Sequence, residues 1–374
     1  MKNHSTKVAF VVSGIRKSLQ FEWTARELRK QGIEQYYILF GEKNTPLAAC
    51  LRGLQIPVFE FRLFRRAGIL ICFLNVFFLL LRIRPHVVHT HMQEANFFGL
   101  LAARLLFIKK RIYTRHHSTF HHDYHSNAVK RDRFINDLST TIIAPSMKTA
   151  EVLINRERVE KAKIQCIPHG FDLQYFADVE EVRVELLRSR YGISKQERLI
   201  IGCIARYTHF KGVQILIPAF RKFLQKFPDA RLLLANARGD FQTEIRQLLQ
   251  TLPAGSFREI EFEDDAAALY RLFTINVNLH VDPYAEAFGQ TFVEALASGV
   301  PSVFTLSGVG CEFIVDRENA LVATYHDAES AFLQMSELAV DGDLQRRIIA
   351  GGRRSVAQFD IALMTERLYA LYRS

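Results

Sequence analysis

The stretch Glu286-Ala-Phe-Gly-Gln-Thr-Phe-Val-Glu294-Ala-Leu-Ala-Ser-Gly-Val-Pro301 decides the fold and the site expected for this chain. Two carboxylates stand eight positions apart in it, and a glycine lies between them. Apolar side chains recur with helical spacing over residues 290–298. The pattern therefore predicts a helix there, with Glu286 in the preceding loop and Glu294 inside the helix. The alternative is a surface helix that carries two solvated glutamates.

The start of this helix is a candidate anion site. Gly289, Gln290 and Thr291 would present free backbone N–H groups there, and the helix dipole adds partial positive charge. Donors and carboxylates that face one small space suit a polyhydroxylated, phosphorylated ligand.

The composition is that of a folded protein with two domains of ordinary size. The chain has 374 residues, of which 49% are hydrophobic and 24% are charged. Its five cysteines are scattered and form no C-x-x-C pair, which favours a reducing compartment over a disulfide framework or a cysteine-based zinc site. The first residues lack a secretory signal pattern, so we expect a cytoplasmic protein.

Positive charge is concentrated in the first half of the chain. Residues 1–180 hold 27 Lys and Arg against 15 Asp and Glu, a net +12, whereas residues 181–374 hold 22 against 24, a net −2. A basic excess confined to one domain indicates an anionic partner, and we expect a membrane surface. A nucleic-acid partner is not expected, because the chain has no RNP-type aromatics and no recognition-helix signature.

An apolar run at residues 67–81 lies within this basic half. It has 15 residues, fewer than the roughly 20 that cross a bilayer. Two interpretations are open: a buried helix of an α/β domain, or a helix lying in the plane of a membrane. We expect a combination, in which one face packs in the domain and the basic rim touches lipid. The arginines of this rim are Arg62, Arg65, Arg66, Arg82 and Arg84.

Strand-like and helix-like runs alternate along both halves, which predicts parallel sheets covered by helices on both faces. Strands are expected at 7–12, 36–40, 57–61, 86–90, 111–114, 141–144 and 164–168, and then at 198–205, 231–235, 260–263, 276–280 and 302–305. A linker is expected at about 168–181. Two such domains would place a site at the carboxyl ends of their strands.

Five ordered motifs carry a resemblance to a known family. The chain resembles the retaining GT-B glycosyltransferases of family 4, also called glycosyl transferases group 1, over almost its whole length. The motifs are Arg84-Pro-His-Val-Val-His-Thr-His91, Arg111-Ile-Tyr-Thr-Arg-His116, Ile164-Gln-Cys-Ile-Pro-His-Gly-Phe-Asp172 with Phe176, Gly202-Cys-Ile-Ala-Arg206 with Lys211-Gly212, and the paired glutamates.

The resemblance implies an α/β protein of the GT-B fold, in which two Rossmann-like, doubly wound parallel-sheet domains face each other across a cleft. It implies an acceptor-side domain at residues 1–168 and a nucleotide-sugar-binding domain at residues 169–357. A C-terminal helix at about 358–374 is expected to pack back on the first domain.

The resemblance also assigns the donor side of the site. Arg206 and Lys211 would bind the diphosphate and stabilise it as the leaving group, because two cations at strand and helix ends can neutralise its charge. Glu294 would accept hydrogen bonds from the ribose. Glu286 would face the transferred sugar and stabilise an oxocarbenium-like state, without being assigned as a nucleophile. His116 would contact the donor sugar near the reacting carbon.

The acceptor side departs from the family. Gly14 and His91 are expected to line it, and His117 is the neighbouring alternative to His116. Where the family commonly has a Gly-Gly loop after the first strand, this chain has Ser13-Gly14-Ile15-Arg16-Lys17. The donor is expected to be a UDP- or GDP-linked sugar, with no cofactor and no metal.

Two other patterns resemble metal sites. His121 and His125 have i, i+4 spacing, but no cysteine or second carboxylate cluster accompanies them. Asp341-Gly-Asp343 resembles the D-x-D of metal-dependent transferases, but it precedes an expected helix, where aspartate is an ordinary cap. We expect neither pattern to bind a metal.

The sequence therefore predicts a retaining hexosyltransferase, peripheral on the inner face of the cytoplasmic membrane. Its acceptor would be a glycan or a lipid-linked glycan, in surface polysaccharide or lipopolysaccharide synthesis. Two alternatives stay open: a soluble transferase that makes a small glycoside, and a non-catalytic glycan-binding or scaffolding protein of the same fold.

Overall fold

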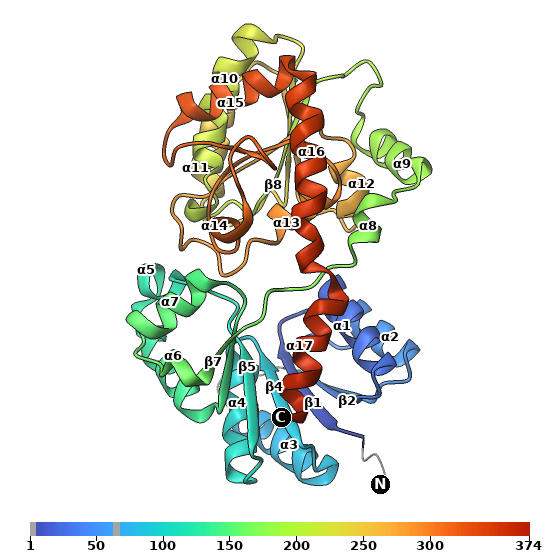
Figure 1. Cartoon of the computed structure of the whole chain (residues 1–374), viewed down its shortest axis with the longest axis vertical. Helices are drawn as coiled ribbons and strands as arrows, with labels where there is room; N and C mark the ends of the chain where they lie inside the picture. Colours follow the sequence, from blue (N-terminus) through green and yellow to red (C-terminus); the bar gives the residue numbers. More distant parts are fainter. Residues whose placement is uncertain (1–4, 63–67) are drawn as a thin grey trace. The chain divides into compact units, whose positions relative to one another are not determined.

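The computed structural model describes residues 5–62 and 68–374, and every structural statement below refers to these residues. The chain divides into two compact units, one formed by Met1–Phe171 with Phe359–Ser374 and the other by Asp172–Gln358. Each unit contains one parallel sheet with helices packed against it (Figure 1). Both units are Rossmann-like, which confirms the fold class predicted from the alternating pattern.

The sheet of the first unit has seven strands in the order β3-β2-β1-β4-β5-β6-β7, all paired in parallel. Helical crossovers connect parallel neighbours, and burial on both faces explains why residues 8–12 of β1 form a continuous apolar run. The strands are β1 (Lys7–Ser13), β2 (Glu34–Phe40), β3 (Val58–Phe61), β4 (Val87–His91), β5 (Lys110–Thr114), β6 (Thr141–Ala144) and β7 (Ile164–Cys166). The helices are α1 (Leu19–Lys30), α2 (Pro46–Gly53), α3 (Gly68–Ile83), α4 (Gln93–Leu105), α5 (Phe120–Tyr124), α6 (Ser126–Leu138), α7 (Met147–Asn155), η1 (Lys161–Lys163) and α17 (Ile361–Arg373).

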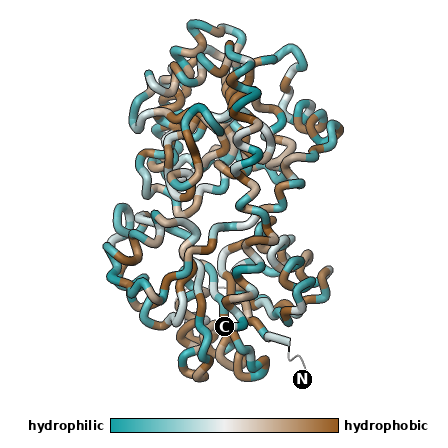
Figure 2. Tube along the Cα trace, in the orientation of Figure 1, coloured by the Kyte–Doolittle hydropathy of each residue, from teal (hydrophilic) through white to brown (hydrophobic). Residues whose placement is uncertain are grey.

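Helix α3 contains the apolar run, which Figure 2 shows as a mostly hydrophobic segment. Cys72, Val76 and Leu80 follow one another at i, i+4 spacing and are buried in the core formed with β1, β2 and α4. The opposite face leaves large apolar side chains in solvent, among them Phe78, which is 60% exposed. The expected packing of one face is thus confirmed. Arg65 and Arg66 lie outside the described residues.

The C-terminal helix α17 belongs to the first unit, although the whole second unit, Asp172–Gln358, lies between it and the rest of the first unit in sequence. In Figure 1 it is the red helix beside the blue α1. Gln31 Nε2, just after α1, donates to Thr365 Oγ1 over 3.2 Å, and Lys110 Nζ donates to the Tyr372 carbonyl over 3.0 Å. These bonds join α17 to both α1 and β5.

The sheet of the second unit has six strands in the order β10-β9-β8-β11-β12-β13, again all parallel. The strands are β8 (Ile200–Ile204), β9 (Arg231–Ala235), β10 (Phe257–Ile260), β11 (Ile275–Leu279), β12 (Ser302–Thr305) and β13 (Leu321–Val322). The helices are α8 (Leu173–Ala177), α9 (Glu181–Tyr191), η2 (His209–Lys211), α10 (Val213–Lys226), α11 (Gln242–Leu249), α12 (Ala266–Tyr270), α13 (Gln290–Ala297), α14 (Gly310–Phe313), α15 (Ala328–Val340) and α16 (Gly342–Val356), followed by η3 (Ala357–Phe359), which spans the boundary between the units.

One local prediction in this unit, the bounds of a strand, was wrong. The strand expected at 260–263 is β10, Phe257–Ile260, whose charged side chains hid it because it is an edge strand with a face in solvent. The boundary between the two units, after Phe171, lies within the expected linker at about 168–181. The later part of that segment forms α8, which begins where the Asp172 side chain accepts from Tyr175 N, and which buries Phe176.

The prediction that Asp341 caps a helix was correct. Its carboxylate accepts from Leu344 N over 2.8 Å and caps α16, so the D-x-D-like pattern is a helix start.

Candidate active site

The loop after β8 carries Lys211 to the end of the neighbouring strand β11. Gly212 makes this approach possible: its φ is +70°, and a Cβ there would lie 1.4 Å from the carbonyl oxygen of Leu279. Only glycine tolerates that backbone conformation and that contact together. Lys211 is therefore held directly beside the residue that follows β11, His280.

Lys211, Glu286 and His280 form a cluster at the carboxyl ends of β8 and β11. Lys211 Nζ is ion-paired with Glu286 Oε1, and both side chains are 15% exposed. His280 Nε2 lies 3.1 Å from the same oxygen, and His280 is buried. Burial would raise the pKa of Glu286, but the Lys211 charge and the His280 bond outweigh it and hold that pKa well below its usual range. Glu286 is thus ionised at neutral pH.

Glu294 lies one helical turn into α13 and has a different environment. Tyr270 OH donates to Glu294 Oε2 over 3.1 Å. Burial raises the pKa of Glu294 to about 7, although the Tyr270 bond and the Lys211 charge oppose this shift. The two glutamates are therefore one strong and one weak acid, and only Glu294 changes its protonation state near neutral pH.

The start of α13 lies between these two carboxylates. Gly289 is the N-cap residue with a φ of 91°, and no side chain caps the helix. Thr291 Oγ1 is buried and has no hydrogen-bond partner within the described ranges. A ligand oxygen at this helix start could satisfy the hydroxyl, and the helix dipole would favour an anionic one. Gln290 is exposed at the same helix start.

Arg206 follows β8 by two residues and is exposed. In the part of the chain that the structure describes, it forms no ion pair with Glu286 or Glu294. The structure therefore brings Lys211, Glu286, Glu294 and the start of α13 together in the second unit. Arg206 lies just beyond the carboxyl end of β8, the strand that also precedes Lys211.

In the first unit, His91 and His116 meet at the carboxyl ends of β4 and β5. His91 pairs in register with Thr114, so a residue two positions beyond Thr114 can reach back to His91. His91 Nδ1 lies 3.0 Å from His116 Nε2. Burial lowers the pKa of His116 to about 4, and burial with three neighbouring imidazoles holds the pKa of His91 well below its usual range. Both rings are neutral at pH 7.

His91 and His116 line a small cavity of about 30 Å³. Two more histidines, His89 and His169, line it as well. His169 stacks on His116 with ring centroids 5.7 Å apart, and its Nδ1 lies 2.6 Å from Gln20 Nε2. His89 Nδ1 lies 2.7 Å from Tyr372 OH, so α17 takes part in this cluster. Gly14, the other expected acceptor residue, follows β1 with a φ of +70° and has open space where a Cβ would be.

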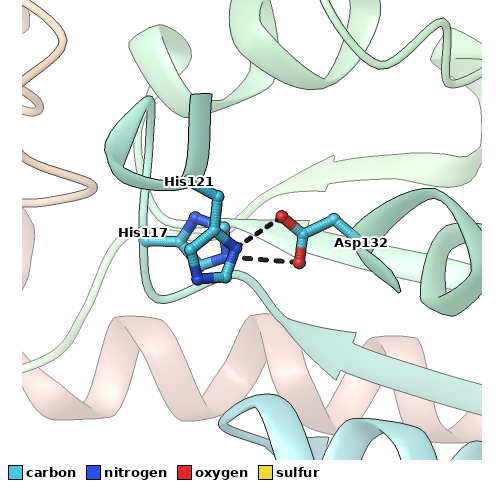
Figure 3. Close-up of side chains that lie close together, drawn as sticks. All are labelled: His117, His121 and Asp132. Atoms are coloured by element: carbon cyan, nitrogen blue, oxygen red, sulfur yellow. Dashed lines mark hydrogen bonds and ion pairs between the residues drawn. The ribbon is translucent and has the colours of Figure 1, made fainter. Parts of the chain in front are cut away.

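His117 turns to a different group, shown in Figure 3 with His121 and Asp132. His121 Nδ1 lies 2.6 Å from Asp132 Oδ2, and His117 Nε2 lies 3.6 Å from Oδ1. The three ligand atoms lie within 4.8 Å of one another and are of types that bind zinc. However, the Arg115 guanidinium also lies 3.5 Å from Asp132 Oδ2, and a cation there repels a second one.

We therefore interpret this trio as a polar network that supports the loop after β5. Burial would raise the pKa of Asp132, but its bonds to His117 and His121 and the charge of Arg115 hold that pKa well below its usual range. Arg115 is also ion-paired with the buried Glu157, which is why the network persists in the core. The expectation of no metal stays a prediction.

The sequence interpretation missed two residues of the second unit. His280 was assigned only as the end of an expected strand, although its place at a carboxyl end was a usable signal. Tyr270 carries no such signal, because it ends a short helix far from Glu294 in sequence.

Comparison with known sequences identifies both halves of the chain. Residues 24–175 match the family described as Glycosyltransferase Family 4, and residues 187–355 match Glycosyl transferases group 1. The chain is 29% identical over 204 residues to mannosylfructose-phosphate synthase of Agrobacterium fabrum, covering 52% of this chain and 44% of that protein. It is 25% identical over 207 residues to phosphatidyl-myo-inositol mannosyltransferase of Mycolicibacterium smegmatis, covering 55% and 50%.

These alignments span about half the length of the curated relatives. Among solved structures, Anabaena HepE in complex with UDP and glucose superposes with a TM-score of 0.84 at 18% identity, over 98% of this chain and 99% of that one. At that identity the likeness concerns the fold. Together with the two sequence families, it shows that the chain belongs to the GT-B glycosyltransferases of the family 4 type.

Proposed function

We propose that this protein is a retaining glycosyltransferase that moves a hexose-type sugar from a nucleotide-diphosphate donor to a glycan or lipid-linked acceptor at an anionic membrane surface. The observation that carries the proposal is the cluster of Lys211, Glu286 and Glu294 at the start of α13. It combines a cation, an ionised carboxylate and a titratable carboxylate beside a helix start that no side chain caps.

A sugar nucleotide suits this cluster for three reasons. Lys211 and the exposed Arg206 supply the positive charge that a departing diphosphate needs, which is the basis for proposing a metal-independent reaction. Glu294 supplies oxygen acceptors for ribose hydroxyls. The start of α13, with the partnerless buried hydroxyl of Thr291, would hold a phosphate or sugar oxygen. The UDP and glucose named for Anabaena HepE are consistent with such a donor.

The environment of Glu286 favours a stabilising role over a nucleophilic one. Its Oε1 is bound by Lys211 and by His280, so its lone pairs are less available to attack carbon. An ionised carboxylate held in this way can stabilise positive charge on the sugar ring. We propose that the leaving phosphate takes the proton of the acceptor hydroxyl, with attack on the face from which it leaves.

A membrane-associated acceptor is supported by α3. No helix among the described residues is long and apolar enough to span a membrane. However, α3 leaves Leu70, Ile71, Leu74, Phe78 and Leu81 between 39% and 64% exposed. Exposed apolar side chains beside the basic excess of the first half suit an anionic lipid surface. The lipid-linked product implied by the name phosphatidyl-myo-inositol mannosyltransferase agrees with this choice.

The first test is a thermal-shift screen of the purified protein against UDP, GDP, ADP and their common sugars, with a chelator present. The proposal expects one nucleotide class to raise Tm by more than roughly 2–3 °C at concentrations well above its Kd. Incubation of that donor with detergent-extracted lipid-linked glycans should then yield a glycosylated lipid product.

Two alternatives would be recognised by the same assays. A soluble transferase that makes a small glycoside, as the name mannosylfructose-phosphate synthase describes for one relative, would bind the donor but glycosylate only water-soluble acceptors. A non-catalytic glycan-binding or scaffolding protein would show no shift with any nucleotide while remaining folded.

A further inference from the structure

The His91–His116 pair requires a defined proton arrangement. His91 Nδ1 and His116 Nε2 lie 3.0 Å apart. A hydrogen bond between two neutral imidazoles needs one N–H and one lone pair, so one of these two atoms carries a proton and the other does not. Two arrangements are possible, and they differ in which atom His116 offers to a ligand.

The pair is held in a neutral state. Burial is the largest influence on both rings, and the titratable groups that face them are the imidazoles of His89 and His169. Within the described residues, neither His91 nor His116 forms an ion pair with a carboxylate. A proton added to either ring would therefore lack an anion to stabilise it.

The other nitrogen of His91 decides between the two arrangements. His91 Nε2 is buried and has no hydrogen-bond partner among the described residues. A buried N–H without an acceptor costs more than a ring lone pair left unused. His91 therefore keeps Nε2 unprotonated and carries its proton on Nδ1, where it donates to His116. Phe21 packs edge-on against the His91 ring at 4.8 Å between centroids and restricts its rotation.

We propose that His91 is a positioning residue that holds His116 in its Nδ1–H form, so that His116 acts on a substrate as a hydrogen-bond donor and not as a base. His116 accepts from His91 at Nε2, which uses its only lone pair. His116 is partly exposed, so its Nδ1–H can reach a ligand. The ligand group it fits is an oxygen acceptor such as a sugar hydroxyl.

The assignment of His116 as a donor in catalysis rests on the proposed glycosyl transfer, but the tautomers do not. The first experiment therefore needs no substrate. Full-length protein labelled with ring-15N histidine would be studied by two-bond 1H–15N correlation NMR from pH 8 to about pH 5. His91→Asn and His116→Gln would assign the two signals.

The expected spectra show both rings as Nδ1–H tautomers that do not titrate above about pH 5. A proton on His116 Nε2, or a titration of His116 near its ordinary midpoint of about 6.5, would overturn the proposal.

Two substitutions then separate positioning from mere packing. The side-chain amide of His91→Asn stands where Nδ1 stood and can still donate, so His116 should remain in the Nδ1–H form. His91→Ala removes the donor, so His116 should become a mixture of tautomers. The exposed His326→Asn in the second unit is the matched control and should change neither signal.

With a transferase assay in hand, His91→Ala should lower kcat by about 10- to 100-fold with KM changed less than about 3-fold, and His91→Asn should recover most of that loss. An equal loss in both variants would refute a positioning role. If His91→Ala does not fold, the native spectrum and His91→Asn still decide the question. A protein without transferase activity but with the expected tautomers would refute the proposed function alone.

Discussion

The ammonium of Lys211 and the carboxylate of Glu286 form an ion pair at the carboxyl ends of two adjacent strands, although 75 positions separate them in sequence. Each side chain is 15% exposed, so the pair is mostly shielded from solvent. The pair keeps Glu286 ionised and holds the lysine at the carboxyl edge of the second sheet.

Removing the Lys211 charge should weaken donor binding. Lys211→Met keeps the apolar stem but loses the charge-assisted bonds to phosphate, so Kd for the preferred nucleoside diphosphate should rise about 10- to 100-fold. Isothermal titration calorimetry would measure this. Lys222→Met is the control, because Lys222 forms an ion pair on the surface of the same unit and should leave Kd unchanged. An unaltered Kd in Lys211→Met would show that the diphosphate binds elsewhere.

Donor binding should depend on the protonation of Glu294. Because burial raises the pKa of this carboxyl to about 7, the ionised acceptor of ribose hydroxyls is lost as pH falls through that value. Nucleotide affinity should therefore drop by up to about 10-fold per pH unit below 7. Glu294→Gln should flatten this dependence. If both proteins show the same pH profile, Glu294 does not contact the nucleotide.

The raised pKa of Glu294 should also make the stability of the ligand-free protein depend on pH. Between about pH 4.5 and 7, the carboxyl of Glu294 is protonated in the folded protein but ionised in the unfolded protein. The folded state therefore binds more protons in this range, and the free energy of unfolding falls as pH rises through it. Glu294→Gln should therefore raise Tm relative to the native protein at pH 8 more than at pH 5. Glu244→Gln, at an exposed position, should shift Tm equally little at both pH values.

Gly212 should tolerate no side chain. Gly212→Ala places a Cβ against the Leu279 carbonyl in a backbone conformation that L-residues avoid, so it should lower the free energy of unfolding by about 3 kcal/mol or more. Gly255→Ala has a similar φ of +78° but open space around it, and it should cost only about 1 kcal/mol. Urea unfolding of both variants would measure the difference. Equal losses would mean that the close contact at Leu279 is not rigid.

The exposed face of α3 should govern association with lipid. Replacing Leu74 and Phe78 together by serine removes apolar area worth roughly 1–2 kcal/mol each, so co-sedimentation with vesicles containing anionic lipid should fall at least about 10-fold. The matched control is Val182→Ser with Leu186→Ser on α9, where both side chains are 60% exposed. Equal binding by native and α3-substituted protein would contradict a membrane role for this helix.

The sequence alone determined most of the secondary structure of the second unit and the placement of the paired glutamates. Strands β9 and β12 have the predicted bounds, and α13 begins at the predicted Gln290. These elements were predictable because uninterrupted apolar runs and helical spacing are local properties of the chain. The edge strand β10 was misplaced, because half-solvated strands lose that local contrast. The exact domain bounds and the cleft between the domains stay predictions.

Only the tertiary structure decided which side chains meet. The register of parallel strands places His91 beside His116, and the close contact of Gly212 with the Leu279 carbonyl brings Lys211 to His280 and Glu286. Tyr270 donates to Glu294 because the fold packs α12 near α13. No local pattern encodes these pairs, because each depends on how segments distant in sequence are aligned by the sheet. The different pKa values of the two glutamates follow from that alignment.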